Sequence, residues 1–357
     1  MRSKSSREDH CRQQGFRLSR LAPVVCSALL AACAAAPGQP GNTTTSLEYT
    51  SVTRGLAALP ASERNLPTVT AEPYFKVSDK AFAIEGPSFD RQGNLLFVDI
   101  YGGRLLRLSP KLELSTVYTD SKLIPAGVAI HRDGRVFLAG VGDFKAGAIV
   151  AVDADGRNST TIIGPGAGYV PDDLVFDDSG GFYFTDFKGS ATSPTGGVYY
   201  VSPDFKTTTP ILASMAMANG VALSPDGKTL WATEFSAGRL HRVDLTGPGT
   251  IAHFGTSTPY QFVGRSPDSM RSDVDGNIYV AIYHQARILV LNPTGVPIGQ
   301  ILIPGREDNH FLKTTSLAFK PGTRDLYIVA RDELGDRGTM IFRTRGFAEG
   351  SRLFSHR

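Results

Sequence analysis

The chain has 357 residues, with 37 Lys and Arg against 34 Asp and Glu, which leaves a net charge of only +3. No basic stripe with interleaved aromatic residues occurs, so a nucleic-acid partner is not expected. The sequence also contains no phosphate-binding loop, dinucleotide-type glycine motif or zinc-type Cys/His cluster.

The first 33 residues have the pattern of an export signal. Arg12, Arg17 and Arg20 precede an apolar run, residues 21–32, which is too short to span a bilayer. The run ends in Leu-Ala-Ala-Cys33, which resembles the bacterial lipobox, in which the cysteine becomes the acylated first residue of the mature protein. Residues 1–33 are therefore predicted to be a lipoprotein-type signal peptide, with the protein exported to the cell envelope or periplasm and anchored to the membrane by lipid at Cys33. A small-residue signal-peptidase site in the same stretch is the alternative.

Residues 34–68 are rich in Ala, Pro, Gly, Thr and Ser and are expected to form a flexible tether. Residues 69–357 are expected to form one domain. All three cysteines lie within residues 1–33, so this domain is predicted to fold without disulfides, which its length allows.

Six similar turns divide the domain into repeats. Their reference glycines are spaced 41 to 49 residues apart, at Gly93, Gly134, Gly180, Gly227, Gly276 and Gly322. A period of this size indicates a repeat architecture, because one unit cannot bury its apolar face alone. A short β-rich run follows each turn and a further strand follows each run, with room for one more strand before the next unit. The sequence therefore predicts an all-β fold, a six-bladed β-propeller.

The position eight residues before each reference glycine is occupied in turn by Glu85, Ala126, Asp172, Asn219, Asp268 and Thr314. The first strand of each propeller blade lines the central channel, so these residues are expected to form a ring. Glu85, Asp172, Asn219 and Asp268 would supply three carboxylates and an amide, a set that suits a hard cation such as calcium. Each of these residues taken singly has a structural role in a turn as the alternative.

Several segments carry a resemblance to the gluconolactonase/senescence-marker (regucalcin) family, and in particular to its drug-responsive lactonase branch. They are Pro171–Asp177, Gly196–Pro203, Ala218–Gly220, Gly264–Ser269 and Pro297–Gly305. The resemblance covers about residues 70–350 and implies a calcium-dependent propeller that hydrolyses lactones.

The resemblance also implies roles for single residues. Glu85, Asp172 and Asn219 match the calcium ligands of the family, Asp268 matches the ligand that also transfers protons in catalysis, and Ser269 is similar to an additional ligand. The drug-responsive branch resembles a two-calcium protein, but the corresponding segments here lack the expected hydroxyl and carboxylate groups. Only main-chain oxygens of Gly147 and Tyr169 remain there, so one strong central calcium site is expected, with other divalent cations as substitutes.

These residues suffice for hydrolysis of a cyclic ester to a hydroxy acid, with the metal polarising the carbonyl and Asp268 as general base and acid. A small-molecule lactone is the expected partner, and the protein is expected to be a monomer. A phosphotriester hydrolase of the same fold and a non-catalytic exported binding propeller remain the alternatives. His284 and His310 lie in loops that can reach the channel mouth, whereas His131 and His241 are expected at the surface or in packing. Asp99, Asp186 and Glu234 are expected to form structural hydrogen bonds, an inference from their repeated place near strand ends.

Overall fold

The computed structural model describes residues 46–50, 53–264, 266–334 and 336–357. The predicted signal peptide and Cys33 lie outside these residues. The helical segments among the described residues are four short 3-10 turns, at Ala61–Glu63, Pro165–Ala167, Arg306–Asp308 and Phe354–His356. None of the helices in the described part of the chain has the length and hydropathy needed to cross a bilayer.

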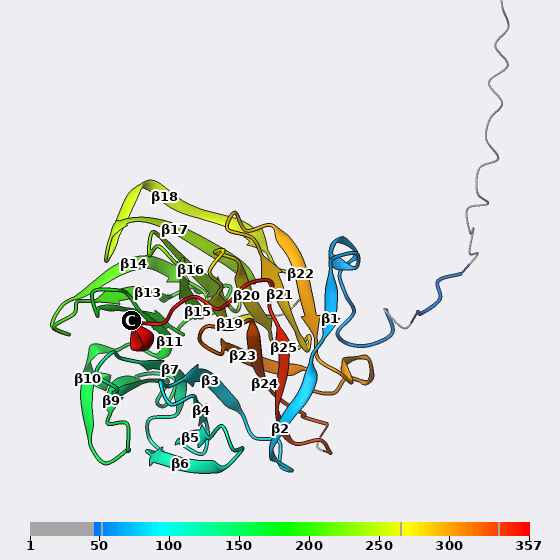
Figure 1. Cartoon of the computed structure of the whole chain (residues 1–357). Helices are drawn as coiled ribbons and strands as arrows, with labels where there is room; N and C mark the ends of the chain where they lie inside the picture. The colour runs from blue at the N-terminus through cyan, green and yellow to red at the C-terminus, as the bar shows by residue number, and fades with distance from the viewer. Residues whose placement is uncertain (1–45, 51–52, 265, 335) are drawn as a thin grey trace, which may run out of the picture. The chain divides into compact units, whose positions relative to one another are not determined.

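Strands make up six sheets that stand radially around a central axis, as Figure 1 shows, and this confirms the predicted six-bladed propeller. Neighbouring strands within each of the six blades pair in antiparallel fashion. The innermost strands, which surround the axis, are β3 (Ile84–Phe89), β7 (Pro125–Ile130), β11 (Pro171–Phe176), β15 (Ala218–Leu223), β19 (Pro267–Ser272) and β23 (Lys313–Phe319). All six begin one residue before the predicted ring position, so the register placed the predicted residues at the start of the inner strands.

The remaining strands follow in order outward from the axis. The second strands are β4 (Leu95–Asp99), β8 (Val136–Gly140), β12 (Phe182–Asp186), β16 (Thr229–Glu234), β20 (Ile278–Ile282) and β24 (Asp325–Arg331). The third strands are β5 (Arg104–Leu108), β9 (Ala148–Val152), β13 (Gly196–Val201), β17 (Arg239–Gly247), β21 (Arg287–Leu291) and β25 (Thr339–Arg345). The outer strands of the first five blades are β6 (Leu114–Thr119), β10 (Ser159–Ile163), β14 (Thr208–Met215), β18 (Thr250–Gln261) and β22 (Pro297–Leu302).

The sixth blade takes its outer strand from the start of the domain. Strand β2 (Glu72–Ser78) pairs antiparallel with β25, so that Glu72 lies opposite Arg343. Strand β1 (Thr68–Thr70) then adds in parallel to β22 as a fifth strand of the fifth blade. The beginning of the domain therefore holds the last two blades together, and the ring is closed by hydrogen bonds between strands far apart in sequence.

The core contains six large apolar clusters, each formed between the facing sheets of two adjacent blades, and a small seventh one around Ala126, Val141 and Val170. Between blades two and three, for example, Phe137 packs edge-on against Phe176 with ring centroids 4.9 Å apart. Every blade is thus buried on both faces, which explains the nearly continuous apolar character of the second and third strands.

The predicted tether ends earlier than residue 68. The side chain of Glu63 is buried and forms an ion pair with Arg287 of β21, and it also accepts a hydrogen bond from the hydroxyl of Tyr260. Gln300 donates to the main-chain oxygen of Glu63 at 3.0 Å. The composition of this segment gave no sign that the carboxylate of Glu63 would be buried. Its contacts with blade five hold the end of the segment in place.

Candidate functional site

A β-bulge in each inner strand directs one side chain toward the axis. The strand register shifts at or immediately after Glu85, Asp172, Asn219 and Asp268, where the inner strand has more residues than its neighbour. A bulge turns the side chain away from the regular alternation of a strand, and bulges are common beside active sites. The bulge recurs in the inner strand of all six blades. This explains why the residues that point to the axis recur at a nearly constant distance from the turn.

The sixth ring position was predicted one residue too early. In blade six the turn hydrogen bond runs from the N–H of Thr323 to the carbonyl of Lys320, whereas in blade one the N–H of Gly93 makes this bond to Asp90. Thr323, not Gly322, is therefore the structural counterpart of the reference glycines. The bulge of β23 accordingly falls between Thr314 and Ser316, and Thr315 is the residue that lines the channel.

The six ring residues surround one end of a cavity of about 130 Å³ at the point where the inner strands begin. All four predicted metal ligands that line it, Glu85, Asp172, Asn219 and Asp268, are buried, with side chains from four different blades. Ala126 and Thr315 complete the ring. The structure thus brings together the three carboxylates and the amide that the sequence predicted.

Two oxygen atoms of this ring have no hydrogen-bond partner among the described residues. They are Oδ1 of Asp172 and Oδ1 of Asn219, both buried. A buried oxygen without a partner is costly, and structures tolerate it where an ion or water completes the bonding. The all-oxygen set with two unpartnered members fits a hard cation such as calcium.

The three ring carboxylates disfavour their own ionisation when no cation compensates them. Burial raises the pKa of Glu85 well above its usual range, and the charge of Asp268 and a hydrogen bond with that residue raise it further. Burial and then the charge of Glu85 raise the pKa of Asp172. Burial and then the charge of Asp172 likewise raise the pKa of Asp268. A cation at this place would remove the repulsion that causes part of these shifts.

Threonines on the second strands hold the ring strands in place. The hydroxyl of Thr185 donates to the carbonyl of Asn219 at 2.5 Å, and the hydroxyl of Thr233 donates to the carbonyl of Asp268 at 2.8 Å. Each bond runs from one blade to the inner strand of the next. A β-carbon at Gly220 would lie 2.5 Å from the carbonyl oxygen of Asp268, so glycine is required for this close approach.

Ser269 occupies a different place from the other predicted ligands. Its N–H donates to Oδ1 of Asp268 at 2.9 Å, and its hydroxyl acts on Glu85, whose pKa it lowers against the larger effect of burial. It is buried and does not belong to the lining of the cavity. In this arrangement Ser269 orients two of the ring carboxylates.

A buried ion pair between Asp173 and Arg271 lies next to the ring, and sequence reasoning missed it. Asp173 is buried and accepts a hydrogen bond from Nη1 of Arg271 at 3.0 Å, with its other oxygen bonded to the N–H of Leu174. Its charge acts on all three ring carboxylates. The adjacency of Asp173 to Asp172 was visible in the sequence, but the partner 98 residues away was not.

The mouth of the cavity is largely aromatic. Tyr101, Phe144, Phe187, Phe235 and Tyr283 line it together with a single cation, Arg331. Phe187, Phe235 and Tyr283 each come directly after the second strand of their blade, a shared position that the sequence analysis did not use. Tyr101 and Phe144 stand further along in the loops.

Arg331 is the charged group at this mouth. Its Nη2 donates to Glu333 at 3.0 Å and lies 3.4 Å from the hydroxyl of Tyr283. Its Nε is buried and has no partner among the described residues. The mouth thus combines apolar rings with a guanidinium that has hydrogen-bonding capacity left.

One of the two main-chain oxygens considered for a second calcium site, that of Tyr169, has another partner. The carbonyl of Tyr169 accepts a hydrogen bond from the N–H of Gly147 at 2.7 Å. The ammonium group of Lys188 lies 2.9 Å from the carbonyl of Gly168 and 3.1 Å from Asp186. A protein cation therefore stands in this region already.

The histidines do not line the central cavity. His284 lies 3.0 Å from the ammonium of Lys313, and His310 lies 2.8 Å from Asp332. His131 packs among phenylalanines and His241 hydrogen-bonds with Glu234, as their assignment to packing predicted.

The repeated acidic residues near the strand ends have structural hydrogen bonds, as expected. Asp99 accepts a hydrogen bond from the N–H of Gly102, Asp186 from that of Val170, and Glu234 from that of Ala216. These carboxylates hold the loops that lead into or out of the strands.

Comparison with known proteins supplies the family. Residues 84–331 match the SMP-30/Gluconolactonase/LRE-like region. A protein of Staphylococcus saprophyticus named lactonase drp35 is 49% identical over 313 residues, which cover 86% of this chain and 97% of that protein. The protein of the same name from Staphylococcus aureus is 48% identical over 299 residues, covering 82% of this chain and 92% of the relative.

Solved structures agree on the fold. A calcium-binding protein, regucalcin, from Agrobacterium tumefaciens has a TM-score of 0.67 at 19% identity, covering 82% of this chain and 99% of its own. A gluconolactonase from Xanthomonas campestris has a TM-score of 0.63 at 19% identity, covering 78% and 95% of the two chains. The match over residues 84–331 and the identity to the staphylococcal proteins place this chain in the SMP-30/gluconolactonase/LRE-like family.

Proposed function

We propose that this protein hydrolyses lactones to hydroxy acids with the help of a divalent cation, calcium, at the centre of the propeller. The observation that carries the proposal is the ring of three buried carboxylates and one amide, two of whose oxygens have no partner among the described residues. Relatives that share about half of their residues with this chain bear the name lactonase. That the regucalcin neighbour is described as calcium-binding also supports the choice of ion.

Glu85, Asp172, Asn219 and Asp268 would hold the cation, and Ser269 would orient Glu85 and Asp268. A bound divalent cation polarises a carbonyl and stabilises negative charge on its oxygen. Asp268 is the proposed general base, which takes a proton from the attacking water and returns one to the ring oxygen as the ester bond breaks. Its position is fixed on two sides, by the N–H of Ser269 on its side chain and by Thr233 on its carbonyl.

The aromatic mouth indicates the kind of lactone. Five aromatic side chains around a cavity of about 130 Å³ suit a compact apolar or aromatic ring better than a polyhydroxylated sugar lactone, whose hydroxyl groups would find few partners there. Arg331 would bind a polar substituent at the rim of the ring.

The test is a panel of an aromatic lactone, an aldonic lactone and a phosphotriester, each measured with saturating calcium and with chelator. We expect the aromatic lactone to be hydrolysed fastest, and chelation to abolish turnover reversibly. Faster turnover of the phosphotriester would identify a phosphotriesterase instead. No turnover of any compound by the folded, calcium-saturated protein would leave a binding propeller as the correct interpretation.

We also propose that the protein is exported and held at the membrane by lipid on Cys33, because a basic segment, a short apolar run and a lipobox-like sequence occur in the expected order. Cys33 lies outside the described residues. The propeller would then act in the cell envelope, joined to its anchor by the low-complexity segment that precedes Glu63.

A further inference from the structure

A second and larger cavity, the lower cavity, lies where the six inner strands end. Its volume is about 670 Å³, within the range of small-molecule sites. The residues three positions after the ring residues all line it, and they are Ser88, Ala129, Val175, Ala222, Arg271 and Ala318. Five of these six are small, so the cavity exists because the inner strands carry short side chains at one level of the channel.

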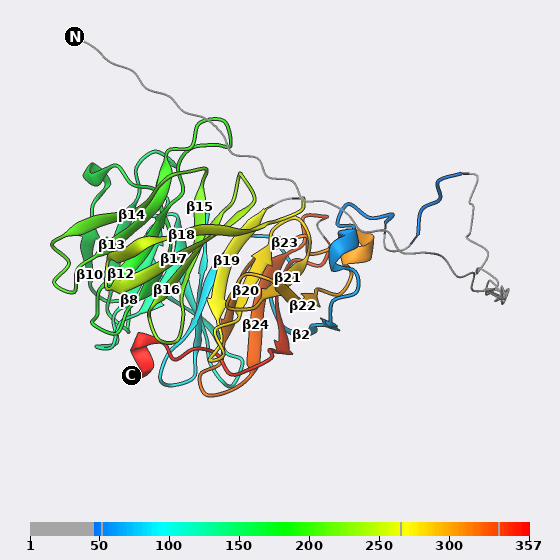
Figure 2. The same cartoon turned by 90° about the horizontal axis from the view of Figure 1, so that it is seen from above.

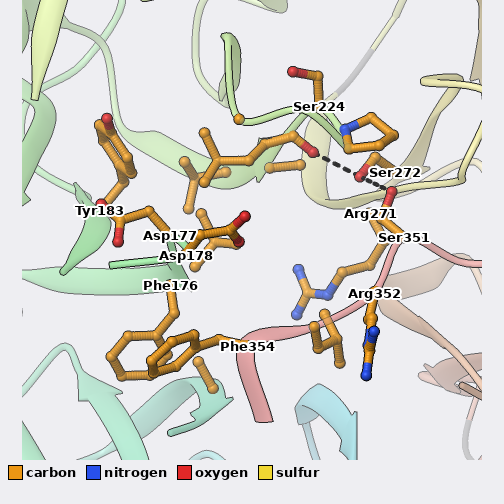
Figure 3. A pocket seen from close by; sticks show the side chains of 18 of the residues that line it. Phe176, Asp177, Asp178, Tyr183, Ser224, Arg271, Ser272, Ser351, Arg352 and Phe354 are labelled. Carbon is orange, nitrogen blue, oxygen red and sulfur yellow. Dashed lines mark hydrogen bonds between the residues drawn. The ribbon is translucent and has the colours of Figure 1, made fainter. Parts of the chain in front are cut away.

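The sixth member of this level is Arg271, which is the only charged residue among the six. Its side chain is 15% exposed, and Figure 3 shows it among the side chains that surround the hollow. Nη1 donates to Asp173 and to the carbonyl of Met270. Its Nε and Nη2 make no hydrogen bond to any described residue. Those two nitrogens form the edge of a guanidinium that binds carboxylates with two parallel hydrogen bonds.

The acidic residues around the cavity are already engaged. Asp177 accepts hydrogen bonds from the hydroxyl of Tyr200 and from the N–H of Ser179, each 2.8 Å long. Asp178 pairs with Arg357, and Asp226 accepts hydrogen bonds from Ser224 and from the N–H of Lys228. These three carboxylates therefore do not pair with the Nε and Nη2 atoms of Arg271. The positive charge on those two nitrogens favours binding of an anion.

The C-terminal segment covers part of this end of the channel. Figure 2 shows it on a single side of the propeller. Ser351 bonds to the carbonyl of Ser272 through its N–H at 3.0 Å and lies 2.9 Å from the hydroxyl of the same residue. Further along, Phe354 stacks on Phe176 with ring centroids 5.5 Å apart. Over blade three the cover thus places the ring of Phe354 against the cavity, beside the ion pair of Arg357 with Asp178.

We propose that this lower cavity binds a small organic carboxylate with an apolar body, its carboxylate paired with Arg271 and its body packed against the side of Phe176 and Phe354. The chemistry is that of a guanidinium held by a buried carboxylate, with one edge unpaired, in a space lined mainly by aliphatic and aromatic groups. The other two arginines of the lining bond elsewhere, Arg357 to Asp178 and Arg352 through Nε to the carbonyl of His356. The site is separate from the metal ring, from which Asp173 divides it, and its occupation does not depend on the proposed hydrolysis.

The test uses isothermal titration of the calcium-saturated protein with 4-phenylbutyrate, and with 4-phenylbutanol as the neutral counterpart. We expect saturable binding of one carboxylate per chain and binding of the alcohol weaker by about 10-fold or more, the value of a charge-assisted pair. Arg271→Met should weaken the carboxylate to the level of the alcohol. Because that change leaves Asp173 without its partner, Val175→Phe serves as a second variant that fills the cavity and leaves the ion pair intact, and it should abolish binding of both compounds.

Asp268→Asn is the matched control, because it alters the metal ring and not the lower cavity. Binding of the carboxylate that is lost in Asp268→Asn and kept in Val175→Phe would show that the anion sits on the metal, and would overturn the proposal. Equal affinity of the carboxylate and the alcohol, or no saturable binding to the wild type, would overturn it as well. None of these results bears on whether the protein hydrolyses lactones, which the substrate panel decides.

Discussion

Removal of the divalent cation is expected to destabilise the propeller, and to do so more strongly at alkaline than at acid pH. The ring brings three buried carboxylates from three blades into mutual repulsion. A ligand present at about 100 times its dissociation constant stabilises a protein by about 2.7 kcal/mol. For a domain of this size that corresponds to a fall in Tm of roughly 4 °C on chelation.

The pH dependence follows from the raised pKa values. In the cation-free folded protein, burial above all keeps the pKa values of Glu85, Asp172 and Asp268 above those of the unfolded chain, which lie at about 4. The folded state therefore binds more protons than the unfolded state once the pH exceeds about 4, and its stability falls as the pH rises through the raised values. A bound cation takes the place of these protons. The difference in Tm between calcium and chelator should thus be larger at pH about 8 than at pH about 5.

Glu85→Gln tests whether the ring causes this effect. The variant loses one ligand charge but also part of the repulsion, so its chelator-induced fall in Tm should be smaller than that of the wild type and less dependent on pH. Asp204→Asn is the matched control, because Asp204 is an exposed turn carboxylate bonded to the hydroxyl of Ser202. Differential scanning calorimetry measures all three proteins. An equal response in the two variants, or a calcium effect that does not change with pH, would refute the reasoning.

Asp268→Asn should lower kcat for the lactone by roughly 10²- to 10⁴-fold while the protein stays folded, and near wild-type turnover at saturating calcium would contradict the assignment of the base. Ala126→Asp places a further carboxylate in the cation-free ring, so thermal denaturation in chelator should show a lower Tm than wild type; an unchanged Tm would place this residue away from the ring. Glu63→Ala leaves Arg287 buried without its partner and should cost about 3–5 kcal/mol in denaturant unfolding, whereas a loss below about 1 kcal/mol would show that the segment is loosely held. Cys33→Ser should block lipid attachment and leave unprocessed precursor, whereas the mature wild type should sediment with membranes because two or more acyl chains hold firmly; cleavage elsewhere and a freely soluble wild type would exclude lipidation.

The sequence allowed the blades and five of the six ring residues to be predicted, because both depend on local and repeated features. A turn glycine and the strand after it are local signals, and the bulge recurs at a fixed distance from the turn in five blades. The error at Thr314 has the same origin, since blade six keeps its glycine one residue earlier in a turn of different hydrogen bonding. Anchoring the register on a glycine is reliable only where the glycine occupies the same place in the turn.

Closure of the ring could not be predicted in the same way. The pairing of β2 with β25 joins residues that are more than 260 positions apart, and neither strand differs in composition from a strand that pairs locally. The contact of Glu63 with Arg287 is similar, because one carboxylate in a segment rich in small residues gives no signal of burial. Both features depend on where the propeller ends meet, which is a property of the whole ring.

The channel has two levels, the ring of Glu85, Asp172, Asn219 and Asp268 and the level of Arg271 three residues further along the inner strands, and they differ in how many blades each candidate site needs. At the upper level the repeats place oxygen-bearing side chains from four blades at one height, and the proposed metal needs that convergence, so the register detects the candidate site. At the lower level five of the six inner-strand residues are small, and the sixth, Arg271, supplies the charge that the proposed carboxylate would meet. A repeat register therefore identifies sites that need several blades at once and misses those that depend on one residue. The search for ligand sites in a propeller should accordingly begin with the residues that depart from the repeat at each level of the inner strands.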